Sequence, residues 1–251
     1  MPELVTLVTG ASAGLGAEFA RQCAARGEKL ALAARRGDRL EALADEIGGA
    51  EIFPIDLSEA EAPARLIGAL AERRLAVSTL INNAGFGLIG RFAHLPLARQ
   101  SQMIDLNVRA LAELCHLVLP GMIERRKGAI LNVASTAAFQ PGPGMGVYFA
   151  TKAFVLSFTE ALHQEVKGSG IRVSALCPGP TATEFGEVAG FRRQVPARLS
   201  ADAKSVVATG LKGLDRNKAV VIPGMANKVM AQSSRFLPRA SMRRILARLK
   251  F

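Results

Sequence analysis

Short apolar runs alternate with longer amphipathic segments along most of the chain. The runs have the length of β-strands, and the segments between them have the length and periodicity of α-helices. Strands this apolar are buried on both faces, which favours a parallel sheet covered by helices. No internal repeat or Ser/Gly-rich linker divides the 251 residues, so we expect one domain. The expected strands are residues 4–8, 29–34, 51–55, 77–81, 129–133, 171–176 and 218–222.

Helix signals fall between these strands. Ser58 and Glu61 have the spacing of a capping box, which predicts a helix from residue 58 to about residue 74. Pro96 stands where a long helix to about Ile123 would begin. The other expected helices are residues 15–26, 39–47 and 148–167.

Basic residues gather in the last quarter of the chain. The net charge is +11, yet residues 1–187 hold 18 Lys and Arg against 19 Asp and Glu. Residues 188–251 hold 14 Lys and Arg against Asp202 and Asp215 alone. A uniformly basic nucleic-acid-binding protein would not show this division, so we expect no nucleic-acid partner.

Cysteine usage and hydropathy indicate the compartment. Cys23, Cys115 and Cys177 are far apart and form no CxxC pair, so we expect neither a disulfide framework nor a metal site. The chain lacks the basic leader and apolar stretch of a secretory signal. No run approaches eighteen uninterrupted apolar residues, so we expect no spanning helix and a reducing, cytoplasmic location.

The turn after the first expected strand is rich in glycine and leads into a helix. Glycines at such a turn let backbone N–H groups approach a pyrophosphate at the positive helix end. An ordinary Gly-rich turn is the alternative, but its place at the start of the βαβ series favours dinucleotide binding. The expected contacts are Gly10, Ser12, Gly14, Leu15 and Gly16.

The end of the second strand distinguishes the two dinucleotides. An acidic residue here would bind the ribose 2′-hydroxyl of NAD(H), whereas arginine pairs with the 2′-phosphate of NADP(H). The sequence has Arg35 and Arg36, and its first carboxylate, Asp38, lies beyond Gly37. NADP(H) is therefore favoured over NAD(H), the alternative being that both arginines are solvated charges at a helix start.

Two later strands also end in polar residues. Asp56 follows the third strand, at a distance that suits either the adenine or a turn leading into the next helix. Asn82, Asn83, Ala84 and Gly85 follow the fourth strand, on the edge where ligands bind in open α/β sheets. There they tie the loop to the strand, contact the cofactor, or do both.

The only tyrosine, Tyr148, precedes Lys152 by four residues at the start of an expected helix. This spacing puts both side chains on one helical face, where an ammonium lowers the pKa of a phenol toward the working range. Ser135, just past the fifth strand, offers a hydroxyl that could hold a carbonyl oxygen. A surface tyrosine packed on a lysine stem is the alternative. Asn107 lies in mid-helix, where it could bind water, kink the helix or face solvent.

Together these motifs resemble the short-chain dehydrogenase/reductase family, in its order and spacing, over about residues 4–225. The resemblance implies a Rossmann-like, doubly wound parallel sheet of seven strands. It implies that Tyr148 is the catalytic acid or base, and that Lys152 tunes it and binds the nicotinamide ribose. It also implies that Ser135 orients the substrate carbonyl and that Asn107 holds a relay water.

The resemblance extends to the NADP(H)-preferring branch, because Arg35 corresponds to its basic position. Ala13 replaces a basic residue that many of those members carry, so the 2′-phosphate would rest on Arg35 and Arg36. The family's contacts to the nicotinamide imply roles for Pro178, Gly179, Thr181 and Thr183. The resemblance also implies that subunits pair through two long helices, residues 97–123 and 148–167, so we expect a homodimer or homotetramer.

These features predict an NADP(H)-dependent oxidoreductase that interconverts a carbonyl and an alcohol. Its substrate would be uncharged or lipophilic, since the residues expected around the carbonyl are apolar: Phe86, Leu88, Phe139, Met145 and Phe185. Some of these could instead be core residues. A reductase of 3-oxoacyl thioesters is the runner-up. A non-catalytic dinucleotide-binding regulator or lipid-surface scaffold is the alternative from another class.

We expect the catalytic domain to span residues 1–224, with a substrate lid near residues 180–200. Arg192, Arg193 and Arg198 in this lid could meet an acidic group or simply be solvated.

The basic extension, residues 225–251, places apolar residues at helical spacing among arginines. They are Met242, Ile245, Leu246 and Leu249, interspersed with Arg239, Arg243, Arg244, Arg248 and Lys250. Such a helix suits the surface of an anionic membrane, which residues 239–251 could contact, or it docks on its own domain or a partner.

Overall fold

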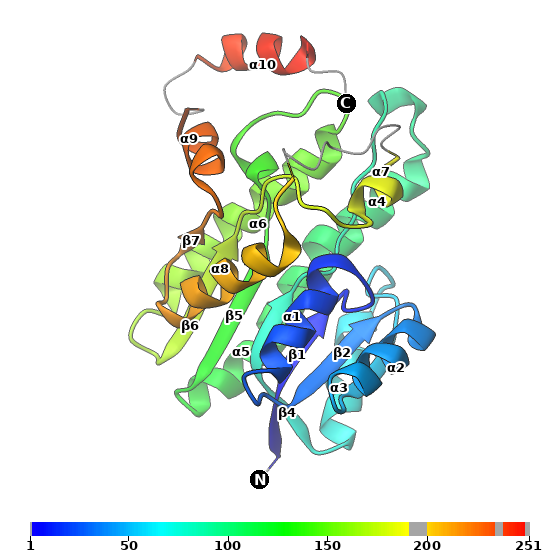
Figure 1. The fold of residues 1–251 in the computed structure, drawn as a ribbon, viewed down its shortest axis with the longest axis vertical. Helices are drawn as coiled ribbons and strands as arrows, with labels where there is room; N and C mark the ends of the chain where they lie inside the picture. Colours follow the sequence, from blue (N-terminus) through cyan, green and yellow to red (C-terminus); the bar gives the residue numbers. More distant parts are fainter. Residues whose placement is uncertain (1, 191–199, 234–237, 249–251) are drawn as a thin grey trace.

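The computed structural model describes residues 2–190, 200–233 and 238–248, and its centre is a seven-stranded parallel sheet. The strand order is β3-β2-β1-β4-β5-β6-β7, which confirms the predicted doubly wound α/β fold (Figure 1). The strands are β1 (Glu3–Thr9), β2 (Leu30–Ala34), β3 (Glu51–Pro54), β4 (Leu75–Asn82), β5 (Gly128–Val133), β6 (Ile171–Leu176) and β7 (Val220–Val221). Every residue of β2 and β5 is buried, as expected for strands covered on both faces.

Helices cover both faces of the sheet (Figure 1). One face carries α1 (Gly14–Ala24), α2 (Gly37–Glu46) and α8 (Ala203–Asp215), which bury Phe19, Leu40 and Val206 against the strands. The other face carries α3 (Ala62–Glu72), α5 (Leu111–Glu124) and α6 (Gly146–Glu165). The sheet is therefore packed between two apolar cores, one on each face. This packing fixes the position of the edge at which the parallel strands end.

The capping box predicted at Ser58 and Glu61 is wrong. Helix α3 begins four residues later, at Ala62, and Glu61 precedes it in a left-handed conformation with φ of 61°. The cause is a competing hydrogen bond: Asp56 Oδ1 accepts from Ser58 N at 2.9 Å and from Ser58 Oγ at 2.7 Å. The Ser58 hydroxyl is thereby held in a local turn and caps no helix.

The long helix predicted after Pro96 is present, but it contains an irregular turn. It runs from Leu97 to Glu124 as α4 (Leu97–Ile104), a π-helical turn η2 (Asp105–Ala110) and α5. Length and composition alone would let this helix cross a membrane, although it contains no run of eighteen uninterrupted apolar residues. However, Leu114 and Met122 on its inner face belong to the core under the sheet, so it is a structural helix of the domain.

Helices α7 (Phe185–Ala189), α9 (Met225–Ser233) and α10 (Arg239–Arg248) gather beyond the carboxyl ends of the strands (Figure 1). Of the apolar stripe predicted in α10, Met242 and Leu246 are buried, and Ile245 is 49% exposed. The helix therefore already packs part of its apolar face against the protein. Three predicted arginines of the lid, and the end of the tail, lie outside the described residues: Arg192, Arg193, Arg198, Leu249 and Lys250. The proposed division at residue 224 stays a prediction.

Candidate active site

The site lies where the strand order reverses, between the carboxyl ends of β1 and β4. Helix α1 begins at Gly14 without a side-chain cap, so its first backbone N–H groups are available to a ligand. Gly10 and Gly14 have positive φ angles of 66° and 55°. A Cβ on Gly16 would lie 2.1 Å from Gly10 O, so only glycine permits this close approach. The glycines thus let the backbone turn sharply next to the uncapped start of α1, and the predicted contact with a pyrophosphate stays a prediction.

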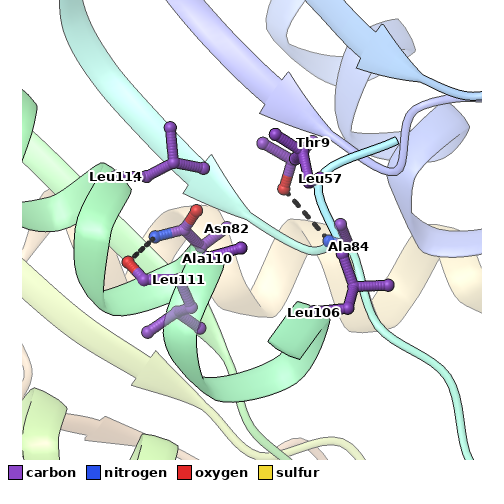
Figure 2. Close-up of a pocket in the computed structure, with 8 residues that line it drawn as sticks. All are labelled: Thr9, Leu57, Asn82, Ala84, Leu106, Ala110, Leu111 and Leu114. Carbon is purple, nitrogen blue, oxygen red and sulfur yellow. Dashed lines mark hydrogen bonds between the residues drawn. The ribbon is translucent and has the colours of Figure 1, made fainter. Parts of the chain in front are cut away.

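The loop after β4 is fastened to this turn by hydrogen bonds. Thr9 Oγ1 accepts from Asn83 N at 3.1 Å and from Ala84 N at 3.0 Å. Asn83 Nδ2 donates to Thr9 O at 3.0 Å and Gly10 O at 3.3 Å. Asn82 points the other way and donates to Leu111 O at 3.3 Å (Figure 2). Both asparagines therefore tie the loop to its neighbours, and Asn83 shapes the turn itself.

A basic cluster stands beside the turn. Arg36 donates to Ser12 Oγ at 3.2 Å and to Glu184 Oε2 at 3.2 Å, and Arg39 Nη1 lies 2.6 Å from Glu184 Oε1. The Arg39 side chain, followed by Arg36, holds the pKa of Glu184 below its usual range. Arg35 is 62% exposed. The contact of Arg36 with the cofactor stays a prediction, and the sequence gave no signal for Arg39 or Glu184.

Asp56 stabilises the turn that leads into α3, which is one of the two roles predicted for it. One carboxylate oxygen is engaged by Ser58, and the other lies 3.9 Å from Arg35 Nη1. A contact with the adenine stays a prediction.

Tyr148, Lys152 and Ser135 converge at the carboxyl end of β5. Tyr148 and Lys152 are both buried at the start of α6, and Lys152 Nζ donates to Val133 O at 2.7 Å. Burial raises the pKa of Tyr148 to about 12, although an interaction with the Ser135 hydroxyl lowers it. Burial also lowers the pKa of Lys152 to about 8. Desolvation disfavours both charged forms, so the predicted lowering of the tyrosine pKa is not observed.

The Asn107 side chain is fully buried, at 1% exposure, in the π-helical turn. Its Oδ1 accepts from Phe86 N at 3.1 Å, and its Nδ2 donates to Phe86 O at 3.0 Å and Thr151 Oγ1 at 3.1 Å. The predicted solvent-facing alternative is wrong. Because both amide protons are in use, a relay water at this residue would have to bind elsewhere than the amide nitrogen.

The stretch after β6 closes the same edge. A Cβ on Gly14 would lie 3.1 Å from Thr183 Cβ, so Thr183 stands over the glycine turn. Thr136 N donates to Pro178 O at 2.9 Å, which links this stretch to the loop that carries Ser135. A Cβ on Gly179 would lie 2.4 Å from Asn227 Oδ1, a close contact from α9 that the sequence did not predict.

Four of the five predicted apolar residues meet around Tyr148. Phe86 and Met145 are buried in one cluster with Tyr148, and Leu88 and Phe185 pack against it. The Phe185 and Tyr148 rings are 5.3 Å apart. Phe139 instead packs against the core under the sheet, the alternative that the sequence left open for some of these residues.

Comparison with known proteins identifies relatives. Residues 4–191 match the family model of short chain dehydrogenases. Sulfoacetaldehyde reductase 2 from Chromohalobacter salexigens is 40% identical over 186 residues, which are 72% of this chain and 74% of that protein. An NADP-dependent 3-hydroxy acid dehydrogenase from Salmonella typhi is 38% identical over 188 residues, covering 74% and 76%. A short-chain dehydrogenase from Sphingobium yanoikuyae, solved in complex with NADPH, superposes with a TM-score of 0.83 at 36% identity over 93% of each chain.

Gly16→Ala should destabilise the protein, because the added methyl group would collide with the Gly10 carbonyl. We expect a loss of about 2 kcal/mol in the free energy of unfolding, measured by urea denaturation. Gly68→Ala in α3 is the matched control, since no heavy atom lies within 4 Å of its added methyl. That control should gain up to about 1 kcal/mol from helix propensity. Equal stability of the two variants would contradict the close approach at Gly16.

Lys152→Met should raise the melting temperature at pH 7, because the protein then no longer buries an ammonium. The native pKa of about 8 lies below the ordinary value of 10.5, so the unfolded chain binds more protons between these pH values. The penalty, at most about 3 kcal/mol, is complete below pH 8 and disappears as the pH rises to 10.5. The difference in melting temperature between variant and wild type should shrink over this window. A constant difference would show that Lys152 is not buried as a cation.

Proposed function

The chain belongs to the short-chain dehydrogenase family, and from this premise we propose that it is an NADP(H)-dependent oxidoreductase that interconverts a carbonyl and an alcohol. The observation that carries the proposal is the convergence of Tyr148, Lys152 and Ser135, on the sheet edge that also holds the open glycine turn. An acid–base group beside a dinucleotide cradle is the minimum that such a reaction requires.

The residues of the site divide the work of proton transfer. The Tyr148 hydroxyl donates a proton to the carbonyl oxygen during reduction and accepts it back during oxidation. The Ser135 hydroxyl holds the same oxygen and fixes the direction from which the proton arrives. Lys152, anchored to Val133 O, offers its remaining N–H groups to the cofactor ribose and favours the phenolate when it is charged. Bound NADP(H) supplies or takes up the hydride.

The choice of NADP(H) rests on the basic cluster. Arg36 and Arg39 bind an anion, the carboxylate of Glu184, which stands in for a 2′-phosphate, and Arg36 also donates to Ser12 Oγ. The glycine turn would hold the pyrophosphate. Two relatives support this assignment: one is named an NADP-dependent dehydrogenase, and the other was solved with NADPH.

An uncharged or lipophilic substrate is supported by the apolar surroundings of Tyr148, namely Phe86, Leu88, Met145 and Phe185. The curated relatives are named for sulfoacetaldehyde and 3-hydroxy acids, which are anionic compounds. A 3-oxoacyl thioester remains the runner-up substrate. The intact Tyr148 and Lys152 argue against a non-catalytic regulator or scaffold.

Assembly through the long helices is supported by apolar side chains exposed on them. Leu117 and Ile123 of α5 and Phe154 of α6 are exposed, and the Phe154 and Phe158 rings stack at 5.7 Å. The burial of Met242 and Leu246 favours docking of α10 on the protein over contact with a membrane.

Tyr148→Phe should lower kcat for reduction of a ketone by NADPH at least about a hundredfold. The ring keeps its packing against Phe149 and Phe185, so NADPH affinity and thermal stability should stay close to wild type. Turnover is followed at the nicotinamide absorbance band and binding by fluorescence. Near-full turnover in this variant would overturn the proposed role of the phenol.

Glu184→Gln should strengthen NADPH binding about three- to tenfold, because the carboxylate competes with the 2′-phosphate for Arg36 and Arg39. NADH, which lacks that phosphate, should bind as before. Fluorescence titration measures both affinities. Glu46→Gln is the matched control, since Glu46 forms a similar exposed ion pair with Arg21 at 2.6 Å. An equal effect on NADH affinity, or no effect on NADPH affinity, would show that the basic cluster does not bind the 2′-phosphate.

A further inference from the structure

A second feature of the same sheet edge is a cavity of about 210 Å³ that the reaction chemistry does not use. It lies between the loop after β4, the start of α4 and the loop that precedes α6. Its described lining includes Leu88, Phe92, Leu95, Met103, Met145 and Val147, and none of the described residues that line it is ionisable. Its volume equals that of about seven water molecules, which is room for one arm of a substrate.

One polar side chain in this lining is incompletely paired. Gln100 is only 4% exposed, and its Nε2 donates to Phe92 O and Leu95 O, each at 3.2 Å. Its Oε1 is buried and has no hydrogen-bond partner within the described part of the chain. Rotating the amide by half a turn would place Oε1 against two carbonyl oxygens, so the present orientation is fixed. A buried acceptor without a partner is costly, and a ligand that brings a donor removes this cost.

The cavity adjoins the catalytic tyrosine through one flexible side chain. Met145 lines the cavity and also packs with Tyr148 in a single apolar cluster. A Cβ on Gly87 would lie 3.2 Å from Met145 Cε and 3.3 Å from Tyr148 Cδ2, so the methionine methyl group stands beside the tyrosine ring. Methionine adapts its shape readily, so an arm of a substrate held at Tyr148 can pass along it.

We propose that this cavity binds the distal arm of the substrate. The arm is uncharged and mainly apolar, and it carries one donor group whose hydrogen bond Gln100 Oε1 accepts. The inference rests on the proposed carbonyl–alcohol activity and narrows its substrate class. An apolar lining binds the body of the arm through burial, while the unpaired Gln100 Oε1 recognises a hydroxyl or an amide N–H at its end. A carboxylate arm is rejected, since it would be buried beside an acceptor and would find no described cation in the lining.

Three acetophenones that differ only in the para chain test this proposal. One carries a hydroxypropyl chain, one a butyl chain of equal length, and one a carboxyethyl chain. We expect wild-type kcat/KM to be about tenfold higher for the hydroxyl chain than for butyl, and lowest for the carboxylate. Equal values for the first two, or preference for the carboxylate, would overturn the inference. Absence of turnover with all three and with acetophenone would instead count against the proposed function.

Substitution of Gln100 provides the second arm of the experiment. In Gln100→Leu the ratio of kcat/KM for hydroxypropyl over butyl should fall to one or below. The ratio is independent of the fraction of folded enzyme, so partial loosening of the loop held by Gln100 does not disturb it. Gln102→Leu, on the same helix and outside the cavity lining, is the matched control and should keep the wild-type ratio. Ligand-observed NMR with the cofactor-free Tyr148→Phe protein measures binding of the same ketones without turnover. If this ratio of kcat/KM values were unchanged in Gln100→Leu, Gln100 would have no part in substrate recognition.

Discussion

The bonds between the loop after β4 and the end of β1 hold the functional edge together. Thr9 and Asn83 join two strands that are neighbours in the sheet although more than seventy residues separate them in sequence. Gly85 follows in the same loop. Its missing side chain leaves room for Asn107 Oδ1 and Lys152 Nζ. The loop therefore connects the glycine turn with the surroundings of Lys152. A shift of this loop would displace both parts of the candidate site.

Beneath this edge lies a buried polar network that keeps β4, β5 and α6 in register. Asn82 and Asn132 are paired residues on adjacent strands, and their side chains are 3.0 Å apart. Asn132 also donates to Thr159 Oγ1 at 3.0 Å on α6. A satisfied network of this kind favours one arrangement of the core, since any slip would leave amides unpaired in an apolar surrounding. It fixes α6, and with it the start of the helix where Tyr148 and Lys152 stand.

Local patterns predicted the parts of the site that depend on local structure. Strand-length apolar runs predicted the sheet, and the glycine spacing and the Tyr148–Lys152 interval predicted the turn and the shared helical face. Contacts between distant segments left no such trace. Glu184 meets Arg36 across 148 positions of sequence, and the Asn227 contact with Gly179 arises only because α9 returns to the sheet edge. The capping box at Ser58 was wrong for a related reason: Asp56 competes for the same hydroxyl, and spacing alone does not decide between them.

The two ends of the site solve opposite electrostatic problems. In the basic cluster, exposed guanidinium groups gather around an anion in contact with solvent, where their charge costs little to maintain. Around Tyr148 and Lys152, burial disfavours charge on both side chains, and the pKa of about 12 keeps the Tyr148 phenol protonated at neutral pH. A protonated phenol is the state that the proposed carbonyl reduction requires. The proposed oxidation requires the phenolate instead, which a positive charge held near Tyr148 would favour. The charged form of Lys152, whose pKa burial lowers to about 8, would supply such a charge.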